Sequence, residues 1–274
     1  MPSQKNNAIK LRANAKINLS LKISGKRSDG FHDIDSIMQS VSLHDEVEVK
    51  AAASGIKIRC APHIDGNIAE IAAKTLLDEI KLVKGVDITI TKHIPLASGL
   101  AGGSADAAAV LTGMNLALGL NLHISKLMEI GAKVGSDVPF CLHGGTCRVT
   151  GRGDKVERIN PKSGVAFILV CPKIELSTKA VYDAYDKTGA EKSNGNDLEL
   201  AAIKIAPEIK NIKDLLMRST GEDWRMSGSG PTLFLDLMDL SEAEKYTEKI
   251  RELKLDFHVV MRMDQGVELI SSPR

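Results

Sequence analysis

Hydrophobic and polar residues alternate strictly near the start of the chain. From Lys16 to Ile23 every second residue is apolar, and Lys16 and Asn18 stand at polar positions two residues apart. Successive side chains of a strand point to opposite faces, so this pattern predicts a half-buried strand with Lys16 and Asn18 side by side on its polar face. Further strands are predicted near residues 47–49, 56–59 and 86–94.

Helical spacing replaces alternation in three other stretches of the first half. Apolar residues three and four positions apart predict helices over about 67–80 and 125–134. A run rich in alanine and leucine predicts a helix over 105–118, which ends at Gly119. Residues 28–35 are polar and are expected to form a loop. Residues 146–159 are expected to form a hairpin with its turn at 151–154.

A different order of elements follows the polar segment 160–164, which is the best place for a domain boundary. The expected elements are strands at 165–171, 224–227, 232–237 and 257–263, and helices at 178–187, 197–219 and 242–252. If the first two helices form one layer, this order is β-α-β-β-α-β, the ferredoxin-like arrangement. We therefore predict two domains, over residues 1–160 and 161–274.

Composition excludes several classes of protein. The 274 residues include 36 Lys and Arg against 35 Asp and Glu, spread along the chain rather than clustered. A partner that is nucleic acid or a membrane surface calls for a basic stripe, so neither is expected. The four cysteines form no Cys-x-x-Cys pair, so reduced thiols are expected and a zinc site is not. A signal peptide and an apolar run of about 20 residues are both missing, which favours a cytoplasmic location.

A glycine-rich segment between a predicted strand and a predicted helix is the clearest candidate for chemistry. It reads Pro95, Leu96, Ala97, Ser98, Gly99, Leu100, Ala101, Gly102, Gly103, Ser104, Ala105. Glycines let backbone N–H groups approach a ligand, and the first N–H groups of a helix have no internal partner, so such a loop can cradle a phosphate. Ser104 adds a hydroxyl for a phosphate or its metal. A turn that merely packs the helix on the strand remains an alternative.

Three other segments are weak when taken singly. Lys16 on a polar strand face is ordinarily just solvated, and Asp137, close to Pro139, is ordinarily a turn or cap residue. The segment Met226–Thr232 is a second glycine turn, which alone could be a hairpin loop. The patterns of the Walker loop, of the dinucleotide-binding loop and of protein kinases do not fit the chain.

Taken together and in this order, the four segments resemble the GHMP kinases, a superfamily named after galacto-, homoserine, mevalonate and phosphomevalonate kinases. Pro95–Ala109 looks like the superfamily's ATP-phosphate motif, P-x-x-x-G-L-x-[GS]-[GS]-[SA], and Ser227–Pro231 looks like its third motif. The resemblance spans nearly the whole chain. It implies an α+β fold, with an N-terminal ribosomal-S5-like α/β domain and a C-terminal ferredoxin-like domain, and an ATP-dependent small-molecule kinase.

One branch of the superfamily is the most similar. The matching segments are Ala15–Leu19, Arg27–Asp33, Gly99–Asp106 and Gly135–Pro139. Members of this branch phosphorylate the 2-hydroxyl of 4-diphosphocytidyl-2-C-methyl-D-erythritol, on the non-mevalonate route to isoprenoid precursors. The loop R-[ST]-D-G-[YF]-H separates the branch from mevalonate and homoserine kinases. Phe31 and Ala101 are mild departures, because tyrosine and glycine are also common at these positions.

The resemblance implies roles for individual residues. Asp137 would accept the proton of the acceptor hydroxyl, and Lys16 would keep Asp137 ionised and stabilise charge on the phosphoryl group. The segment Pro95–Ala105 would bind the phosphates of ATP. Mg²⁺ is expected with ATP, held by the phosphates and Ser104, because no carboxylate cluster is visible.

The acceptor, a small molecule that carries a cytidine diphosphate group, would contact a second set of residues. Phe31 or Tyr182 would stack on the cytosine, and His32 would bind its edge. Thr178 lies in the same stretch as Tyr182, and Asn18 would bind the acceptor near its reacting end. For Tyr182, a helix residue packed on the core is an equal alternative.

Two other functions remain open. A GHMP kinase for mevalonate, homoserine or a sugar would share everything except the loop Arg27–Asp33. A non-catalytic, ribosomal-S5-like binding module would use the glycine loop only structurally, and it predicts no ATP binding. The second function gives no reason for Lys16, Asp137 and both glycine motifs to occur together. The oligomeric state and the adenine contacts are not predicted.

Overall fold

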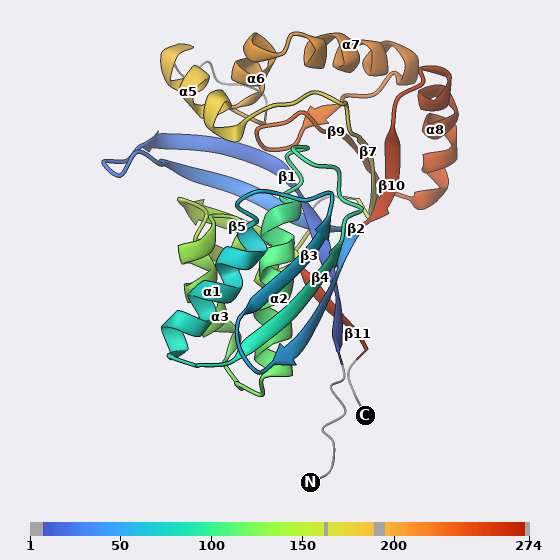
Figure 1. The fold of residues 1–274 in the computed structure, drawn as a ribbon. Coiled ribbons are helices and arrows are strands. Elements are labelled where there is room, and N and C mark those ends of the chain that lie inside the picture. Colours follow the sequence, from blue (N-terminus) through green and yellow to red (C-terminus); the bar gives the residue numbers. More distant parts are fainter. Residues whose placement is uncertain (1–7, 162–163, 189–194, 272–274) are drawn as a thin grey trace.

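Two sheets organise the structure, a computed structural model that describes residues 8–161, 164–188 and 195–271 (Figure 1). The larger sheet contains β1 (Ile9–Lys26), β2 (His32–Ala52), β3 (Ile56–Ala61), β4 (Gly85–Thr91), β5 (Thr146–Gly151), β6 (Lys155–Arg158) and β11 (Val267–Ser271). Its strand order is β11-β1-β2-β4-β3, with β5 paired to β2 and β6 to β5. The smaller sheet contains β7 (Ala166–Val170), β8 (Arg225–Met226), β9 (Leu233–Leu237) and β10 (Phe257–Met261), in the order β10-β7-β9-β8.

Helices cover both sheets. The larger sheet carries α1 (Ile68–Ile80), α2 (Gly102–Ala117), α3 (Ile124–Val134) and α4 (Val138–His143). The smaller sheet carries α5 (Thr178–Thr188), α6 (Glu199–Ile205), α7 (Glu208–Thr220) and α8 (Ala243–Glu252), which follows the 3-10 turn Leu240–Glu242. Helix α2 lies against β1 and β2 with α1, α3 and α4 around it, so it is buried on most sides. Small residues suit this position, and a Cβ on Gly113 would come within 2.6 Å of Val49 Cγ2.

The long hairpin of β1 and β2 differs from the prediction. The predicted strand 16–23 is only the middle of β1, and most of β2 was missed. The expected loop 28–35 is wrong at its end, because β2 already begins at His32. The register between β1 and β2 shifts between Asn18 and Ser20, which breaks the strict alternation. Lys16 and Asn18 are 5% and 2% exposed, so this part of the polar face is buried, whereas Lys22 on the same face is exposed.

The second half confirms the ferredoxin-like prediction, since its elements run β-α-β-β-α-β. The side chains of β7 alternate between two cores, with Phe167 and Leu169 in the first and Ile168 in the second. Burial on both faces explains why this strand is a continuous apolar run. The predicted helix 197–219 is two helices, because Pro207 disfavours a helical conformation at the preceding Ala206.

The last strand was not predicted. After β10 the chain returns to the larger sheet, where β11 pairs antiparallel with β1 and Leu269 lies opposite Leu11. Both ends of the described chain therefore belong to the larger sheet, although residues 161–274 were expected to form one domain. Of the predicted boundary 160–164, residues 162 and 163 lie outside the described residues.

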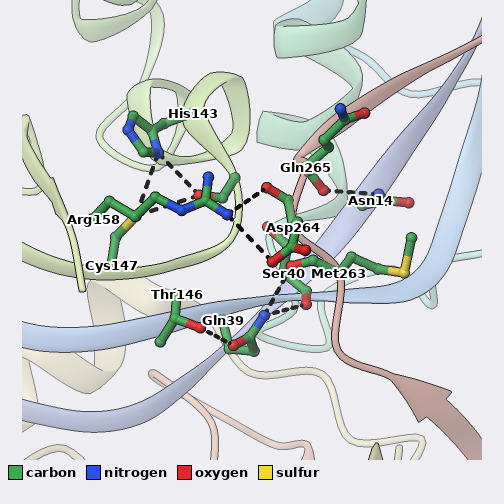
Figure 2. A network of polar contacts seen from close by, with 11 residues as sticks. Asn14, Gln39, Ser40, His143, Thr146, Cys147, Arg158, Met263, Asp264 and Gln265 are labelled. Carbon is green, nitrogen blue, oxygen red and sulfur yellow. Dashed lines mark hydrogen bonds and ion pairs between the residues drawn. The ribbon is translucent and has the colours of Figure 1, made fainter. Parts of the chain in front are cut away.

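Buried amides hold the returning segment in place (Figure 2). Gln39 Nε2 donates to the Met263 carbonyl at 3.1 Å, and Asn14 Nδ2 donates to the Gln265 carbonyl at 2.9 Å. Asp264 accepts from Arg158 at 3.3 Å. The backbone also approaches closely, because a Cβ on Gly266 would lie 1.9 Å from the Cys141 carbonyl oxygen. These specific contacts, rather than a hydrophobic pattern, attach β11 to the first sheet.

Candidate active site

The glycine-rich segment joins β4 to α2, as the sequence predicts. Ala101 precedes α2 in the left-handed conformation, with φ of 56°. No described side chain caps the helix, so the N–H groups of Gly102, Gly103 and Ser104 remain available to a ligand. The helix dipole adds positive potential at the same end. This end of α2 can therefore bind an anion such as a phosphate.

The glycines also pack the loop closely against its neighbours. A Cβ on Gly99 would lie 2.6 Å from the Gly230 carbonyl oxygen, and a Cβ on Gly102 would lie 3.0 Å from Ile94 Cγ2. The segment therefore packs closely against its neighbours, and ligand binding by the same segment stays a prediction. Ala105 is 1% exposed and its N–H donates to the Ala101 carbonyl at 2.9 Å, so the structure keeps this predicted residue inside the helix and away from the site.

Lys16 and Asp137 meet beside the glycine-rich segment. Lys16 Nζ lies 3.4 Å from Asp137 Oδ2, and their side chains are 6% and 30% exposed. The same ammonium donates to Asn18 Oδ1 at 2.7 Å and to the Gly99 carbonyl at 3.3 Å. Asp137 directly precedes α4 and is the more open partner. The pair thus combines a buried cation with a carboxylate that a ligand can reach.

The second glycine turn closes over these residues from the C-terminal domain. Ser227 Oγ accepts from the Asn18 backbone N–H at 3.1 Å. A Cβ on Gly228, whose φ is 57°, would lie 2.9 Å from Asn18 Oδ1. The Thr232 N–H donates to the Ser98 carbonyl at 3.3 Å. The glycine-rich segment and the three segments that were weak singly therefore come together in the fold.

The other end of the site is formed by the tip of the β1–β2 hairpin and by α5, which lie next to each other in Figure 1. The rings of His32 and Tyr182 stack with centroids 5.0 Å apart and an angle of 28° between planes. His32 Nε2 lies 2.7 Å from Asp186 Oδ1, and Asp186 also pairs with Lys26 at 2.6 Å. Burial raises the pKa of the Tyr182 hydroxyl, which therefore stays protonated. Phe31, at the hairpin turn, is 49% exposed.

One cavity of about 810 Å³ between the two domains is lined by residues from both ends of the site. Its walls include the predicted residues Lys16, Asn18, Phe31, His32, Asp137, Thr178, Tyr182 and the segment from Pro95 to Ser104. The glycine-rich segment, Lys16 and Asp137 form one part of the wall, and the stacked rings of His32 and Tyr182 form another part. Thr178 Oγ1 lies 2.9 Å from Ser229 Oγ, which links α5 to the second glycine turn.

The sequence analysis missed a buried ionic cluster below the glycine-rich segment. Lys92 pairs with Asp45 and, at 2.6 Å, with Asp106. Asp45 Oδ1 also accepts from the N–H of Ile94 at 2.8 Å, which anchors the start of the loop. Burial raises the pKa of Asp106 to about 7 against the opposing effect of Lys92. Asp106 is the only charged residue between Leu100 and Leu118, which was an indication that it needs a buried partner.

Arg152, at the tip of the β5–β6 hairpin, is a second missed residue of the cavity wall. A lone arginine in a predicted turn gave no reason to connect it with Phe31, which is far away in the sequence. The described residues contain no group of three or more His, Cys, Asp or Glu that could hold a metal ion. Within the same described part, no helix is long and apolar enough to span a membrane.

Known proteins are similar to this chain in sequence and in fold. Residues 67–145 match the family model of the GHMP kinases N terminal domain, and residues 187–253 match that of the GHMP kinases C terminal domain. A relative from Acetivibrio thermocellus, named 4-diphosphocytidyl-2-C-methyl-D-erythritol kinase, is 44% identical over 83% of this chain and 89% of its own length. A relative of the same name from Bacillus subtilis is 40% identical over 81% of this chain and 86% of its own length.

Solved structures give the same result for the fold. A crystal structure of a 4-(cytidine 5'-diphospho)-2C-methyl-D-erythritol kinase matches with a TM-score of 0.77 and 28% identity, covering 92% of this chain and 99% of the other. Homoserine kinase from Cytophaga hutchinsonii also has a TM-score of 0.77, at 20% identity, covering 98% of this chain and 99% of the other. At 20% identity, the similarity to this homoserine kinase shows that the fold is shared and nothing about the substrate.

Proposed function

Because the chain belongs to the GHMP kinase family, whose members are ATP-dependent small-molecule kinases, we propose that it phosphorylates the 2-hydroxyl of 4-diphosphocytidyl-2-C-methyl-D-erythritol. One observation carries the proposal. A single cavity holds the Lys16–Asp137 pair, the open N-terminus of α2 and the His32–Tyr182 pair. Relatives at about 40% identity that carry this enzyme's name support the choice of acceptor.

The phosphates of ATP would bind at the start of α2. The segment from Pro95 to Ser104 offers backbone N–H groups and the Ser104 hydroxyl, and the helix dipole favours an anion there. The ammonium of Lys16 is tied to the same segment through the Gly99 carbonyl. It would lie against the γ-phosphoryl group, where charge develops during transfer.

Asp137 would act on the acceptor alcohol. Its carboxylate would accept the proton of the 2-hydroxyl as that oxygen forms a bond to the γ-phosphorus and the bond to the ADP oxygen breaks. The Lys16 ammonium lies 3.4 Å from Asp137 Oδ2, so a positive charge stands beside the carboxylate at the point where the hydroxyl would react. Asn18 binds Lys16 at 2.7 Å, so we infer that it orients the ammonium as well as the acceptor.

The cytidine would bind at the hairpin tip and α5. Tyr182 and Phe31 offer aromatic faces for the cytosine, and Thr178 offers a hydroxyl at the same wall. Since Asp186 already occupies His32 Nε2, His32 would bind the base through Nδ1 or its backbone. The stacked position of His32 on Tyr182 would then align the base with both rings.

Mg²⁺ would accompany ATP. The described residues offer the Ser104 hydroxyl beside the phosphate-binding helix end but no cluster of carboxylates, which fits an ion held mainly by phosphate oxygens. Bound in this way, Mg²⁺ neutralises part of the phosphate charge. Ser104 and the N–H groups of α2 would position the phosphates that carry the ion.

A panel of acceptors tests the proposal. With Mg·ATP, ADP release should be rapid with 4-diphosphocytidyl-2-C-methyl-D-erythritol and near background with mevalonate, homoserine or galactose, and the product should carry phosphate on its 2-hydroxyl. Preference for another acceptor would assign the chain to a different GHMP kinase. No thermal stabilisation by Mg·ATP would favour a non-catalytic binding module, because any ligand of the native state raises the melting temperature. A cytoplasmic location and the absence of nucleic-acid and membrane partners remain predictions.

A further inference from the structure

Arg152 is held at the cavity wall by two contacts that leave most of its donors unused. Its Nη2 donates to the Ala132 carbonyl at 2.6 Å, and its guanidinium carbon lies 5.2 Å from the centroid of the Phe31 ring. A guanidinium has five N–H donors, and only one is engaged in this carbonyl contact. The side chain is therefore fixed in position and still able to bind a ligand.

The hairpin turn that carries Arg152 lies next to the proposed reacting end of the site. Gly153, with φ of 108°, lies so close to the turn that precedes α4 that a Cβ on it would be 3.0 Å from the Ser136 carbonyl oxygen. Ser136 directly precedes Asp137. Arg152 thus joins two parts of the site: its neighbour Gly153 packs on the turn that carries Asp137, where the alcohol would react, and its guanidinium lies over Phe31, where the cytidine would bind.

Arg152 also differs from the other cations of the cavity wall in its charge balance. The lysines each pair with a carboxylate: Lys16 with Asp137, Lys26 with Asp186, Lys92 with Asp45 and Asp106, and Lys179 with Asp183. Across the described residues, Arg152 has no carboxylate within ion-pair distance. The nearby Asp29 is paired with Arg27 at 3.1 Å. Arg152 acts on Asp29 only at longer range, so it brings to the cavity a positive charge that no ion pair neutralises among the described residues.

We propose that Arg152 binds the diphosphate of the acceptor, a role that rests on the proposed function. In 4-diphosphocytidyl-2-C-methyl-D-erythritol the diphosphate joins the cytidine to the alcohol, so it must lie between the two ends of the site. A planar guanidinium binds phosphate oxygens through paired hydrogen bonds. Stacking on Phe31 pre-orients the group, which lowers the entropy cost of binding. Phe31 remains 49% exposed under Arg152, so its ring still has surface for the base.

Calorimetry with CDP and cytidine separates a diphosphate contact from a base contact. The wild-type chain should bind CDP more tightly than cytidine. Arg152→Met should lower the affinity for CDP about ten- to hundredfold, the usual worth of hydrogen bonds to a charged group, and change cytidine affinity less than about threefold. Arg152→Lys should lie between the two, because it keeps the charge but loses the planar fork. Arg148→Met is the matched control, since Arg148 lies on the same hairpin and pairs with Asp35 at 2.7 Å outside the cavity.

Steady-state kinetics completes the test. With the natural acceptor, Arg152→Met should raise the acceptor KM by the same factor and leave the KM for ATP unchanged. Equal losses for CDP and cytidine would overturn the proposal, because Arg152 would then act only by holding Phe31. A rise confined to the KM for ATP would also overturn it, by assigning Arg152 to the nucleotide phosphates. Suppose that the wild-type chain phosphorylates the acceptor, and that Arg152→Met and Arg152→Lys bind CDP as tightly as the wild type. This result would refute the role of Arg152 and leave the proposed function standing. A wild-type chain that binds neither CDP nor cytidine would refute the proposed function itself.

Discussion

Replacing Asp137 with asparagine removes a negative charge and a proton acceptor while the size of the side chain is kept. Asp137 Oδ2 lies 3.4 Å from Lys16 Nζ, and its side chain is 30% exposed to the cavity. If Asp137 is the base, kcat should fall about 10²- to 10⁴-fold, the usual worth of a positioned general base. The KM values should change far less, because asparagine still forms hydrogen bonds.

The structure also limits how far the effects of Asp137 and Lys16 can add. A loss of 10²- to 10⁴-fold corresponds to about 2.7–5.4 kcal/mol in the activation free energy. Coulomb's law with an effective dielectric constant of about 20 gives about 5 kcal/mol for unit charges at 3.4 Å. Solvent at the partly exposed Asp137 reduces this value. The reduced coupling is thus of the same order as the expected loss, so the losses should overlap rather than add.

A double-mutant cycle measures this overlap. Asp137→Asn, Lys16→Met and the double variant should be compared by kcat at saturating ATP and acceptor, and the double variant should be little worse than the worse single one. Lys16→Met also removes the contacts with Asn18 and Gly99, so melting temperatures must accompany the rates. Asp35→Asn is a control for loss of an ion-paired carboxylate outside the cavity, and it should leave kcat unchanged.

Two results would refute this reasoning. A near-normal kcat in folded Asp137→Asn would exclude this carboxylate as the base. Losses that multiply fully in the double variant would show that Lys16 and Asp137 act separately, despite their separation of 3.4 Å.

Three other substitutions test separate parts of the structure. Gly99→Ala should lower the melting temperature and raise the KM for ATP, because its Cβ would meet the Gly230 carbonyl oxygen at 2.6 Å; an unchanged melting temperature would contradict this packing. Phe31→Ala should raise the acceptor KM about ten- to hundredfold, since stacking of a base on an aromatic ring contributes about 1–3 kcal/mol, and equal rises for both substrates would argue for a purely structural role. Burial raises the pKa of Asp106 from 3.8 to about 7, so the folded state keeps a proton that the unfolded chain releases, and stability should fall as the pH rises from about 4 to 7. Urea unfolding of Asp106→Asn should show a flatter pH dependence over this range, and the wild-type slope in the variant would disprove the assignment.

Elements with a local physical cause could be predicted from the sequence. The apolar spacing of α1 and α3 depends only on the period of a helix, and the β5–β6 hairpin depends on its turn residues. The glycine-rich segment was recognisable for the same reason, because the conformation of Gly99 and the start of α2 are local properties. The order of elements in the second half then determined the ferredoxin-like arrangement.

Elements whose partners lie far away in the sequence could not be predicted. The first half of β2 is rich in polar residues, and its strand form depends on pairing with β1 and β5. Strand β11 depends on β1 and on the buried amides of Asn14 and Gln39, which are separated from it by most of the chain. Neither the first half of β2 nor β11 has a periodic pattern that would reveal it without its neighbours.

The sequence, through its resemblance to the GHMP kinases, predicts which residues carry the chemistry, whereas the arrangement of these residues is seen only in the folded chain. Lys16, Asp137 and both glycine segments were predicted from their order along the chain, which resembles that of the GHMP kinases. That Lys16 is buried against Asp137 and Gly99, that Lys92 joins two carboxylates, and that Arg152 lies over Phe31 follow from the packing of distant segments. The physical reason is that a charge in a sequence reveals neither its burial nor its partner, and these two properties determine its free energy and its function.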